Sequence, residues 1–322
     1  MNIKLYPLQF VPILKDRIWG GEKLKTILNK PTTSKNTGES WELSTVDGDV
    51  SVVSNGVLKG RSLMRLIAEM PNEILGTKVY SQFGKQFPLL FKYLDAHEDL
   101  SIQVHPNDEL AKKRHNSFGK TEMWYVMQAD PDARIIVGFK EDSNKEEYLK
   151  HLNDKTLVSI LDEVKANAGD VFFLETGTVH AIGAGLVVAE IQQTSDVTYR
   201  LYDFDRTDAQ GNKRELHIDL ALDAINYKKV ETQKEYETKV NTSNVVVDCP
   251  YFTTNLIPLE SKVKISKSGE TFTVYMCIDG DFKIEYEGFE GFYRKGDTVL
   301  VPAEINTFIL VGNASILEIY IS

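Results

Sequence analysis

Cysteine is scarce in this sequence, and so are long apolar runs. The 322 residues include two cysteines, Cys249 and Cys277, too few for a disulfide framework or a zinc site built from thiolates. Any bound metal must therefore be held by nitrogen and oxygen ligands. No apolar stretch approaches the roughly 20 residues that a helix needs to cross a bilayer, and the first residues lack the pattern of a signal peptide. We therefore expect a cytoplasmic protein with no membrane partner.

Clusters of positive charge are also missing. The formal net charge is -10, and no basic run or stripe stands out, which argues against a nucleic-acid partner. An anionic small-molecule ligand would have to be held by a few local lysine or arginine side chains. The length favours two domains.

Short runs of β-branched and aromatic residues, separated by Gly, Asn and Asp, are abundant. Examples are DVFFLETG at 170–177, GLVVAEIQQT at 185–194 and TFILVGNASILEIYIS at 307–322. Many short strands with frequent turns predict a mainly β protein, either a sandwich or a barrel.

Two segments break the strand pattern with helical character, near 62–76 and 143–164. In the second, Ser143 could cap the first turn, and apolar residues recur at spacings of three and four. The segment 228–245 is highly polar without an apolar period, so we interpret it as a linker. We therefore predict a first domain at 1–235 with two helical insertions and a smaller β-sandwich domain at 246–322.

A weak internal repeat supports this division. The stretches 168–182 and 295–310 share Gly-Asp, four strand-forming residues, a turn and another strand. When they are aligned on Asp170 and Asp297, His180 falls on Thr307. We interpret the second unit as a degenerate structural copy of the first, which would hold the one working site.

Four polar residues in apolar strand runs could form that site. Gln103 and His105 are two apart, so in a strand their side chains point from the same face. Glu122 enters a strongly apolar run, where a buried carboxylate needs a partner or a cation. His180 ends a strand at a Gly-Thr turn. Two imidazoles and two oxygen ligands suit zinc or another borderline divalent cation, although Glu122 in a salt bridge and Gln103 in a simple hydrogen bond would be the plainer reading.

Several motifs together resemble a known family, the type I mannose-6-phosphate isomerases, and in particular their short bacterial branch. The motifs are RIWGG at 17–21, FPLLFKYLDAHEDLSIQVHPND at 87–108, GKTEMWYV at 119–126 and GTVHAIGAGLVVAEIQQTSDVTYRLYDFDR at 177–206. The resemblance implies a cupin-type jelly roll in the first domain, one zinc ion per chain, and interconversion of mannose 6-phosphate and fructose 6-phosphate through an enediol.

The resemblance also implies roles for individual residues. The zinc ligands of the family fall on Gln103, His105, Glu122 and His180. Its active-site arginine falls on Arg200, which could instead pair with Asp196, Asp203 or Asp205. Lys120 corresponds to the lysine of the Lys-x-Glu motif, and we expect burial and the charge of the metal to lower its pKa toward that of a proton carrier.

Trp19, Lys92 and Ser101 match pocket positions of the family, which implies that they contact the substrate. Glu190 and Asp196, charged residues near a strand end, complete the predicted substrate-binding set as groups that orient Arg200 and Lys120. Trp19 could instead be core packing, and Lys92 could extend its ammonium out of an apolar strand. Glu190 is a second candidate for the catalytic base. Arg200, Lys92 and Ser101 are candidates for binding the phosphate.

One position departs from the family. Many longer members have a histidine immediately before the lysine of Lys-x-Glu, and here that residue is Gly119. Three other functions stay open from the sequence: a cupin isomerase for a different sugar phosphate, a cupin oxygenase with iron, and a non-catalytic regulatory cupin that binds a sugar phosphate. A monomer and a homodimer are equally compatible with the sequence.

Overall fold

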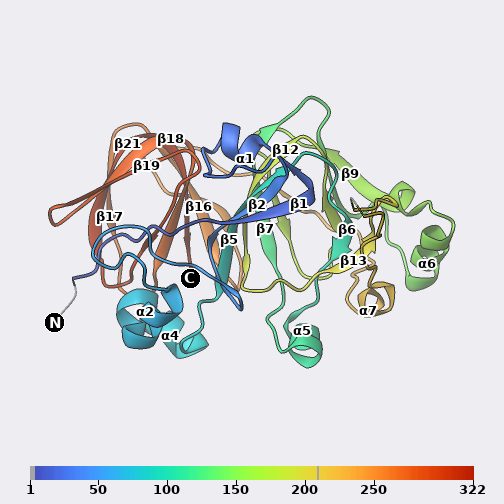
Figure 1. Ribbon diagram of the computed structural model, residues 1–322, viewed down its shortest axis with the longest axis horizontal. Coiled ribbons are helices and arrows are strands. Elements are labelled where there is room, and N and C mark those ends of the chain that lie inside the picture. The colour runs from blue at the N-terminus through green and yellow to red at the C-terminus, as the bar shows by residue number, and fades with distance from the viewer. Residues whose placement is uncertain (1–3, 209) are drawn as a thin grey trace.

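Two groups of β-strands lie side by side in the computed structural model, which describes residues 4–208 and 210–322 (Figure 1). The strands form three large sheets and one two-stranded ribbon. The mainly β architecture predicted from the sequence is confirmed. No helix in the described ranges is long and apolar enough to cross a membrane.

The first group is a sandwich of two sheets. The larger sheet consists of β1 (Ile13–Gly21), β2 (Thr37–Leu43), β5 (Leu89–Ala96), β12 (Leu186–Gln193), β7 (Glu122–Ala129), β10 (Val171–Leu174) and β14 (Gln233–Lys234), in that order. The smaller sheet consists of β13 (Tyr199–Tyr202), β6 (Ile102–Val104), β11 (His180–Ile182), β8 (Arg134–Phe139) and β9 (Leu161–Lys165). Side chains from both sheets meet in one apolar cluster, which includes Leu94, Trp124, Val137 and Ile182.

The second group has one strongly bent sheet with its own apolar core. Its strands are β15 (Asn244–Asp248), β16 (Thr253–Leu259), β21 (Thr307–Tyr320), β18 (Thr273–Tyr286) and β19 (Phe289–Arg294), with β17 (Lys262–Ser266) paired to β21 and β20 (Thr298–Val301) paired to β18. The ribbon is β3 (Thr45–Val46) with β4 (Asp49–Val50).

Both faces of the larger N-terminal sheet are covered. Every residue of β5 and β12 is buried, because alternate side chains face the smaller sheet on one side and the second group on the other. Phe91 and Tyr93, for example, share an apolar cluster with Met276 and Leu317. Lys92 and Leu94, which alternate with them, point to the interior of the first sandwich.

Short helices lie between the strands. They are α1 (Lys23–Thr26), α2 (Leu63–Glu69), α3 (Pro71–Leu75), α4 (Thr77–Phe83), α5 (Asp108–His115), α6 (Lys145–Asn153), α7 (Ile218–Leu222) and a 3-10 turn at Leu157–Ile160. Helices α2 and α3 lie within the predicted insertion at 62–76, and backbone hydrogen bonds from Phe272 to Leu75 and from Ala303 to Ile74 tie this insertion to the second group.

The predicted helix at 143–164 is too long. Helix α6 ends at Asn153, and residues from Leu161 onward form β9, which pairs with β8. A short apolar run can fit either period, and pairing with β8 decides for the strand. The helix cap is Asn144, whose side chain accepts a hydrogen bond from the Glu147 backbone, whereas Ser143 donates to the Glu147 carboxylate.

The polar segment predicted as a linker contains ordered strand. Strand β14 pairs with β10 of the first group, and β15 opens the second group at Asn244. The division into domains at 1–235 and 246–322 stays a prediction.

The repeat noticed in the sequence has matching backbone hydrogen bonds. The carbonyl of Asp170 accepts from Val126 N, and the carbonyl of Asp297 accepts from Cys277 N, each at 2.9 Å. In both turns the Asp side chain accepts from the backbone N–H three residues earlier. The two Gly-Asp turns therefore make the same pattern of hydrogen bonds, which supports our interpretation of the second unit as a copy.

A buried lysine joins the two groups. Lys30 Nζ lies 2.7 Å from Glu42 Oε1 and donates to the Gly296 carbonyl at 2.6 Å. Both charged side chains are about 5–6% exposed. The ammonium also lies over the ring of Tyr93 in β5.

Replacing Lys30 with Met should lower the free energy of unfolding by about 3 kcal/mol or more, because it leaves the Glu42 carboxylate buried without its partner. Urea denaturation measures this change. Lys35→Met, at an exposed position, is the matched control and should alter stability by less than about 0.5 kcal/mol. An equally small effect of Lys30→Met would contradict the interface described here.

Candidate active site

A cavity of about 570 Å³ opens into the first sandwich. Its walls come from β1, β2, β5, β6, β12 and β13. Eight of the residues singled out in the sequence line it: Trp19, Lys92, Ser101, Gln103, Lys120, Glu190, Asp196 and Arg200. The other three, His105, Glu122 and His180, form a buried cluster beside Gln103 and Lys120.

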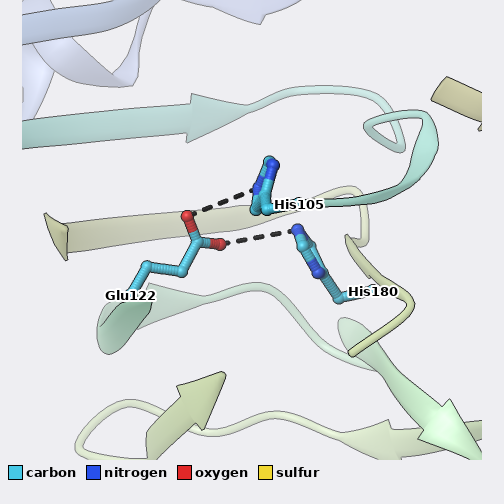
Figure 2. A group of neighbouring side chains, drawn as sticks. All are labelled: His105, Glu122 and His180. Atoms are coloured by element: carbon cyan, nitrogen blue, oxygen red, sulfur yellow. Dashed lines mark ion pairs between the residues drawn. The ribbon is translucent and has the colours of Figure 1, made fainter. Parts of the chain in front are cut away.

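The cluster brings together side chains from three distant segments (Figure 2). His105 follows β6, Glu122 opens β7, and His180 opens β11. Glu122 Oε2 lies 3.6 Å from His105 Nε2, and Glu122 Oε1 lies 3.5 Å from His180 Nε2. Ligands of a tetrahedral zinc ion, each about 2.0–2.1 Å from the metal, lie about 3.4 Å from one another, so these spacings fit a shared cation.

Hydrogen bonds fix which imidazole nitrogens are free. His105 Nδ1 lies 3.0 Å from the Val197 carbonyl, and His180 Nδ1 lies 2.8 Å from the Thr178 carbonyl. Each Nδ1 therefore carries the proton, and each Nε2 lone pair points to the centre of the cluster, as in metal-binding histidines. Burial lowers the pKa of His105 well below its ordinary value and that of His180 to about 4, so both rings are neutral, as metal binding requires.

Glu122 has the strongest need for a cation. Its side chain is fully buried, and neither of its oxygens accepts a hydrogen bond of ordinary geometry within the described part of the chain, although Lys120 Nζ lies 2.8 Å from Oε2. Burial raises the pKa of Glu122 despite the opposing charge of Lys120. A divalent cation would supply the missing partner for both oxygens.

Gln103 completes the donor set. It pairs with His180 across β6 and β11, and its amide nitrogen lies 3.2 Å from His180 Nε2. The oxygen and nitrogen of an amide have the same shape, so rotation by half a turn places Oε1 at the same position. The residues present therefore fit a metal with two nitrogen and two oxygen ligands.

Lys120 lies between this cluster and the cavity. Its ammonium is 3.1 Å from His105 Nε2 and 5% exposed. Burial lowers the pKa of Lys120, but attraction to Glu122 and Glu190 outweighs burial and raises the pKa above its ordinary value. The expected lowering of this pKa also involved the charge of a bound metal and stays a prediction.

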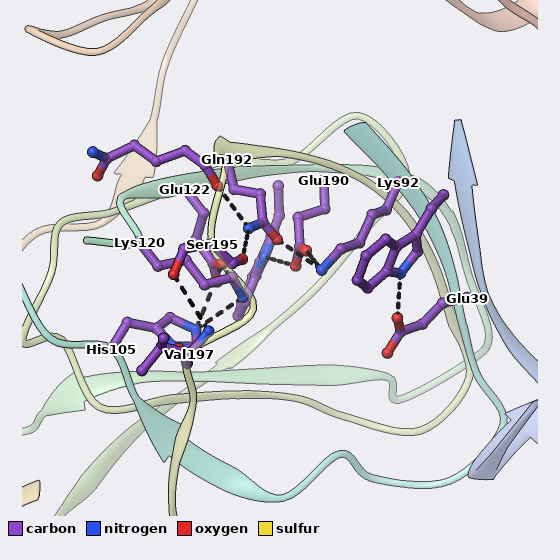
Figure 3. Close-up of polar contacts among 12 residues, drawn as sticks. Glu39, Lys92, His105, Lys120, Glu122, Glu190, Gln192, Ser195 and Val197 are labelled. Carbon is purple, nitrogen blue, oxygen red and sulfur yellow. Dashed lines mark hydrogen bonds and ion pairs between the residues drawn. The ribbon is translucent and has the colours of Figure 1, made fainter. Parts of the chain in front are cut away.

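A second buried network continues along the cavity wall (Figure 3). Lys92 Nζ donates to Glu190 Oε1 at 2.9 Å and to Gln192 Oε1 at 2.7 Å, and Trp124 Nε1 donates to Glu190 Oε2 at 3.1 Å. Burial would raise the pKa of Glu190, but Lys92 and Lys120 lower it to about 2. Lys92 therefore points into the sandwich and does not extend to solvent, and Glu190 is an anion.

Arg200 is oriented without an ion pair. Its guanidinium donates to the Glu215 carbonyl at 2.8 Å and to Ser101 Oγ at 3.3 Å. Asp203, one of the acidic partners considered for it, pairs instead with Arg206 and Arg214. Across 4–208 and 210–322 no carboxylate forms an ion pair with Arg200, so its charge is available to an anionic ligand in the cavity.

Sequence reasoning missed one wall of the cavity. Glu39 accepts hydrogen bonds from Arg17 at 2.8 Å and from Trp41 Nε1 at 2.6 Å, and the Trp41 ring lies beneath the Lys92 ammonium. These residues become neighbours only through the pairing of β1, β2 and β5. The two glutamates of TGESWEL at 37–43 were the available signal, since carboxylates in a buried strand need partners.

Comparison with known proteins agrees with this geometry. A model of the phosphomannose isomerase type I catalytic domain matches residues 7–147, and a model of the mannose-6-phosphate isomerase cupin domain matches residues 241–321. Mannose-6-phosphate isomerase ManA of Bacillus subtilis is 37% identical over 96% of both chains, and the mannose-6-phosphate isomerase of Streptococcus mutans is 37% identical over 97% of both.

The chain belongs to the type I phosphomannose isomerase family. A crystal structure of the mannose 6-phosphate isomerase from Bacillus subtilis superposes with a TM-score of 0.89 at 32% identity, covering 98% of this chain and 99% of that one. A putative mannosephosphate isomerase from Archaeoglobus fulgidus, with a TM-score of 0.82 at 23% identity, shares the fold. The predicted family, β-sandwich fold and enzyme class are therefore confirmed, and within this phosphomannose isomerase the matched cupin domain is the second unit.

Glu190→Gln should lower the free energy of unfolding at pH 7 by about 3 kcal/mol, because it leaves the Lys92 charge buried without its carboxylate. The pKa of Glu190 is lowered to about 2 by folding, so its contribution is full above the unfolded pKa, about 4.3, and is lost as the pH falls toward 2. The difference from wild type should therefore shrink below pH 4.5. Urea denaturation at pH 7, 5 and 3.5 measures it.

Glu290→Gln, in an exposed pair with Lys283, is the matched control and should change stability by less than about 1 kcal/mol at each pH. A loss for Glu190→Gln that is the same at all three pH values would contradict the ionised, lysine-paired state of Glu190.

Proposed function

We propose that this enzyme interconverts mannose 6-phosphate and fructose 6-phosphate through an enediol intermediate. The observation that carries the proposal is the buried His105–Glu122–His180 cluster beside a cavity that holds lysine and arginine side chains. The names of the curated relatives support this substrate pair.

We propose that Gln103, His105, Glu122 and His180 bind one zinc ion per chain. When bound, such an ion polarises substrate oxygens and lowers the cost of removing a proton from the carbon next to a carbonyl. The donor set and the two neutral imidazoles support zinc.

Lys120 and Glu190 are the proposed proton carriers, with Lys120 as the first choice. Both line the cavity and carry opposite charges as they lie here. Lys120 can give a proton to a substrate oxygen from its ammonium form and, once it is neutral, can take the carbon proton; Glu190 is the alternative acceptor. Aldose–ketose isomerisation moves one proton between C2 and C1 of the sugar, so it needs a group that takes the proton and returns it.

Arg200 is proposed to offset negative charge on the substrate. Its guanidinium is the cavity cation that lacks a carboxylate partner among the described residues, in contrast to Arg17, Lys92 and Lys120. It can stabilise the enediolate or hold the phosphate in a two-point contact. Lys92 and Ser101 are further candidates for the phosphate, while Trp19 provides an apolar wall and Asp196 a hydroxyl acceptor. The cytoplasmic location stays a prediction.

The reaction itself is tested in a coupled assay that starts from mannose 6-phosphate. We expect turnover that is lost after treatment with a chelator and restored by zinc. Glucose 6-phosphate and allose 6-phosphate serve as alternative substrates in parallel. Turnover of one of these in place of mannose 6-phosphate would assign a different sugar-phosphate isomerase, and turnover that survives complete metal removal would contradict the metal-dependent mechanism.

Arg200→Ala should lower kcat/KM by about 100-fold or more, as is typical when a preorganised donor to developing negative charge is removed. Arg200→Lys should recover part of the loss, because it keeps the charge without the planar fork. Arg65→Ala, on the exposed face of α2, is the control and should leave kcat/KM unchanged. Near-normal turnover of Arg200→Ala would remove Arg200 from the mechanism.

His180→Ala should abolish stable zinc binding, because it removes one of two imidazole ligands. Elemental analysis of the purified protein measures zinc per chain, and circular dichroism checks the fold. His97→Ala, at an exposed position, should keep the wild-type zinc content. If His180→Ala retains that content too, the proposed ligand set is wrong.

A further inference from the structure

The chain makes an excursion between two of the proposed metal ligands. It leaves the site after His105, forms α5, and returns at Glu122. Residues 106–121 therefore form a loop, and Lys120 lies at its returning end. Whatever holds the two ends of this loop together also sets the position of Lys120 relative to the cavity.

Side chains close the two ends of this loop. Asp108 Oδ1 accepts hydrogen bonds from Gly119 N at 2.7 Å and from Gln193 Nε2 at 3.1 Å. Gln193 Oε1 accepts from Thr121 N at 2.9 Å. We call these four residues, Asp108, Gly119, Thr121 and Gln193, the loop neck.

Backbone pairing between β12 and β7 ends just before Lys120. The register of β12 with β7 ends at Gln192 opposite Glu122, followed by one further bond from Gln193 N to the Thr121 carbonyl at 3.1 Å. The backbone N–H groups of Gly119 and Thr121, on either side of Lys120, donate instead to the side chains of Asp108 and Gln193. Gln193 is 5% exposed and Thr121 is 2% exposed, so loss of these acceptors would leave buried N–H groups unpaired.

Gly119 makes the close approach possible. A Cβ atom at this position would lie 2.7 Å from Asp108 N and 2.9 Å from the carbonyl carbon of Asn107. These are backbone atoms that cannot move aside cheaply. A side chain at 119 is therefore incompatible with the closed neck, which gives a physical reason for glycine where longer members of the family have histidine.

The neck is separate from the substrate cavity. Asp108 and Gln193 do not line that cavity but a second one, of about 620 Å³, between α4, α5 and residues Pro250 and Tyr251. Their side chains instead contact the backbone on either side of Lys120.

We propose that Asp108 and Gln193 are positioning residues that hold the Lys120 ammonium at the substrate through the backbone of Gly119 and Thr121. The proposal rests on the proposed function, in which Lys120 carries the proton. It assigns a role in catalysis to two residues outside the site and predicts that they act as a pair.

Moving the carboxylate from position 108 to position 193 tests whether the two residues act as a pair. Gln193→Glu keeps an acceptor for Thr121 N but places a second carboxylate against Asp108. We expect kcat to fall about tenfold or more, with KM changed by less than about threefold, because a small displacement of a reacting group costs rate more than binding. Asp108→Asn keeps the acceptor for Gly119 and should have little effect. The double variant Asp108→Asn/Gln193→Glu removes the repulsion and should recover most of the lost kcat.

Zinc content, thermal stability and amide hydrogen exchange are measured on the same proteins. We expect zinc content to stay at the wild-type value, while the amides of Gly119 and Thr121 exchange faster in Gln193→Glu and return toward wild type in the double variant. Should Gln193→Glu fail to fold, Gly119→Ala, which opens the neck without a charge, takes its place with the same expected loss of kcat and of amide protection.

Unchanged kcat in Gln193→Glu, or a double variant no better than Gln193→Glu, would overturn the proposal. The failure of the proposed function looks different: wild-type enzyme would then not turn over mannose 6-phosphate at all. Amide hydrogen exchange does not depend on turnover, so it still tests whether the loop neck holds the backbone on either side of Lys120.

Discussion

The Glu122 carboxylate is the group around which the first sandwich is organised. It is fully buried at the start of a strand, between two imidazoles whose free nitrogens face it. Removing a carboxylate from water costs several kcal/mol unless cations and hydrogen bonds compensate. The fold therefore brings β6, β7 and β11 together at one point, and the Lys120 ammonium lies at the same point. A divalent cation there would satisfy an electrostatic need that the protein scaffold has created.

The second unit has similar strand pairing but no buried glutamate at the position of Glu122. Thr307 opens β21 as His180 opens β11, and Thr273 pairs with β20 as Glu122 pairs with β10. The second unit has a buried glutamate at the place of Glu190. This residue is Glu318, whose carboxylate accepts hydrogen bonds from Tyr275 at 2.8 Å and from Asn255 at 3.0 Å. Glu190 receives its bonds from Trp124 and Lys92 in the corresponding places of the first unit. Within the described residues, the second unit therefore lacks counterparts of His180 and Glu122 and keeps a hydrogen-bonded carboxylate at the place of Glu190.

The sequence predicts the His105–Glu122–His180 cluster because its members carry local signals. Gln103 and His105 alternate correctly for a strand, and Glu122 stands out in an apolar run. The wall of Arg17, Glu39 and Trp41 could not be predicted in this way, since it depends on the register of three strands. The pKa of Lys120 also depends on the distances to two carboxylates, which oppose the effect of burial and which the sequence does not provide. The run after Asn153 was assigned to a helix because apolar spacing cannot anticipate its pairing with β8.

The central claim is that one cation is shared by the four side chains of the cluster. Crystals of the zinc-loaded enzyme, with diffraction data collected on both sides of the zinc absorption edge, test it most directly. The account predicts one anomalous peak per chain, within bonding distance of His105 Nε2, His180 Nε2 and an oxygen of Glu122, with Gln103 as the fourth protein ligand. A peak held by other residues, or none in protein that contains stoichiometric zinc, would contradict it.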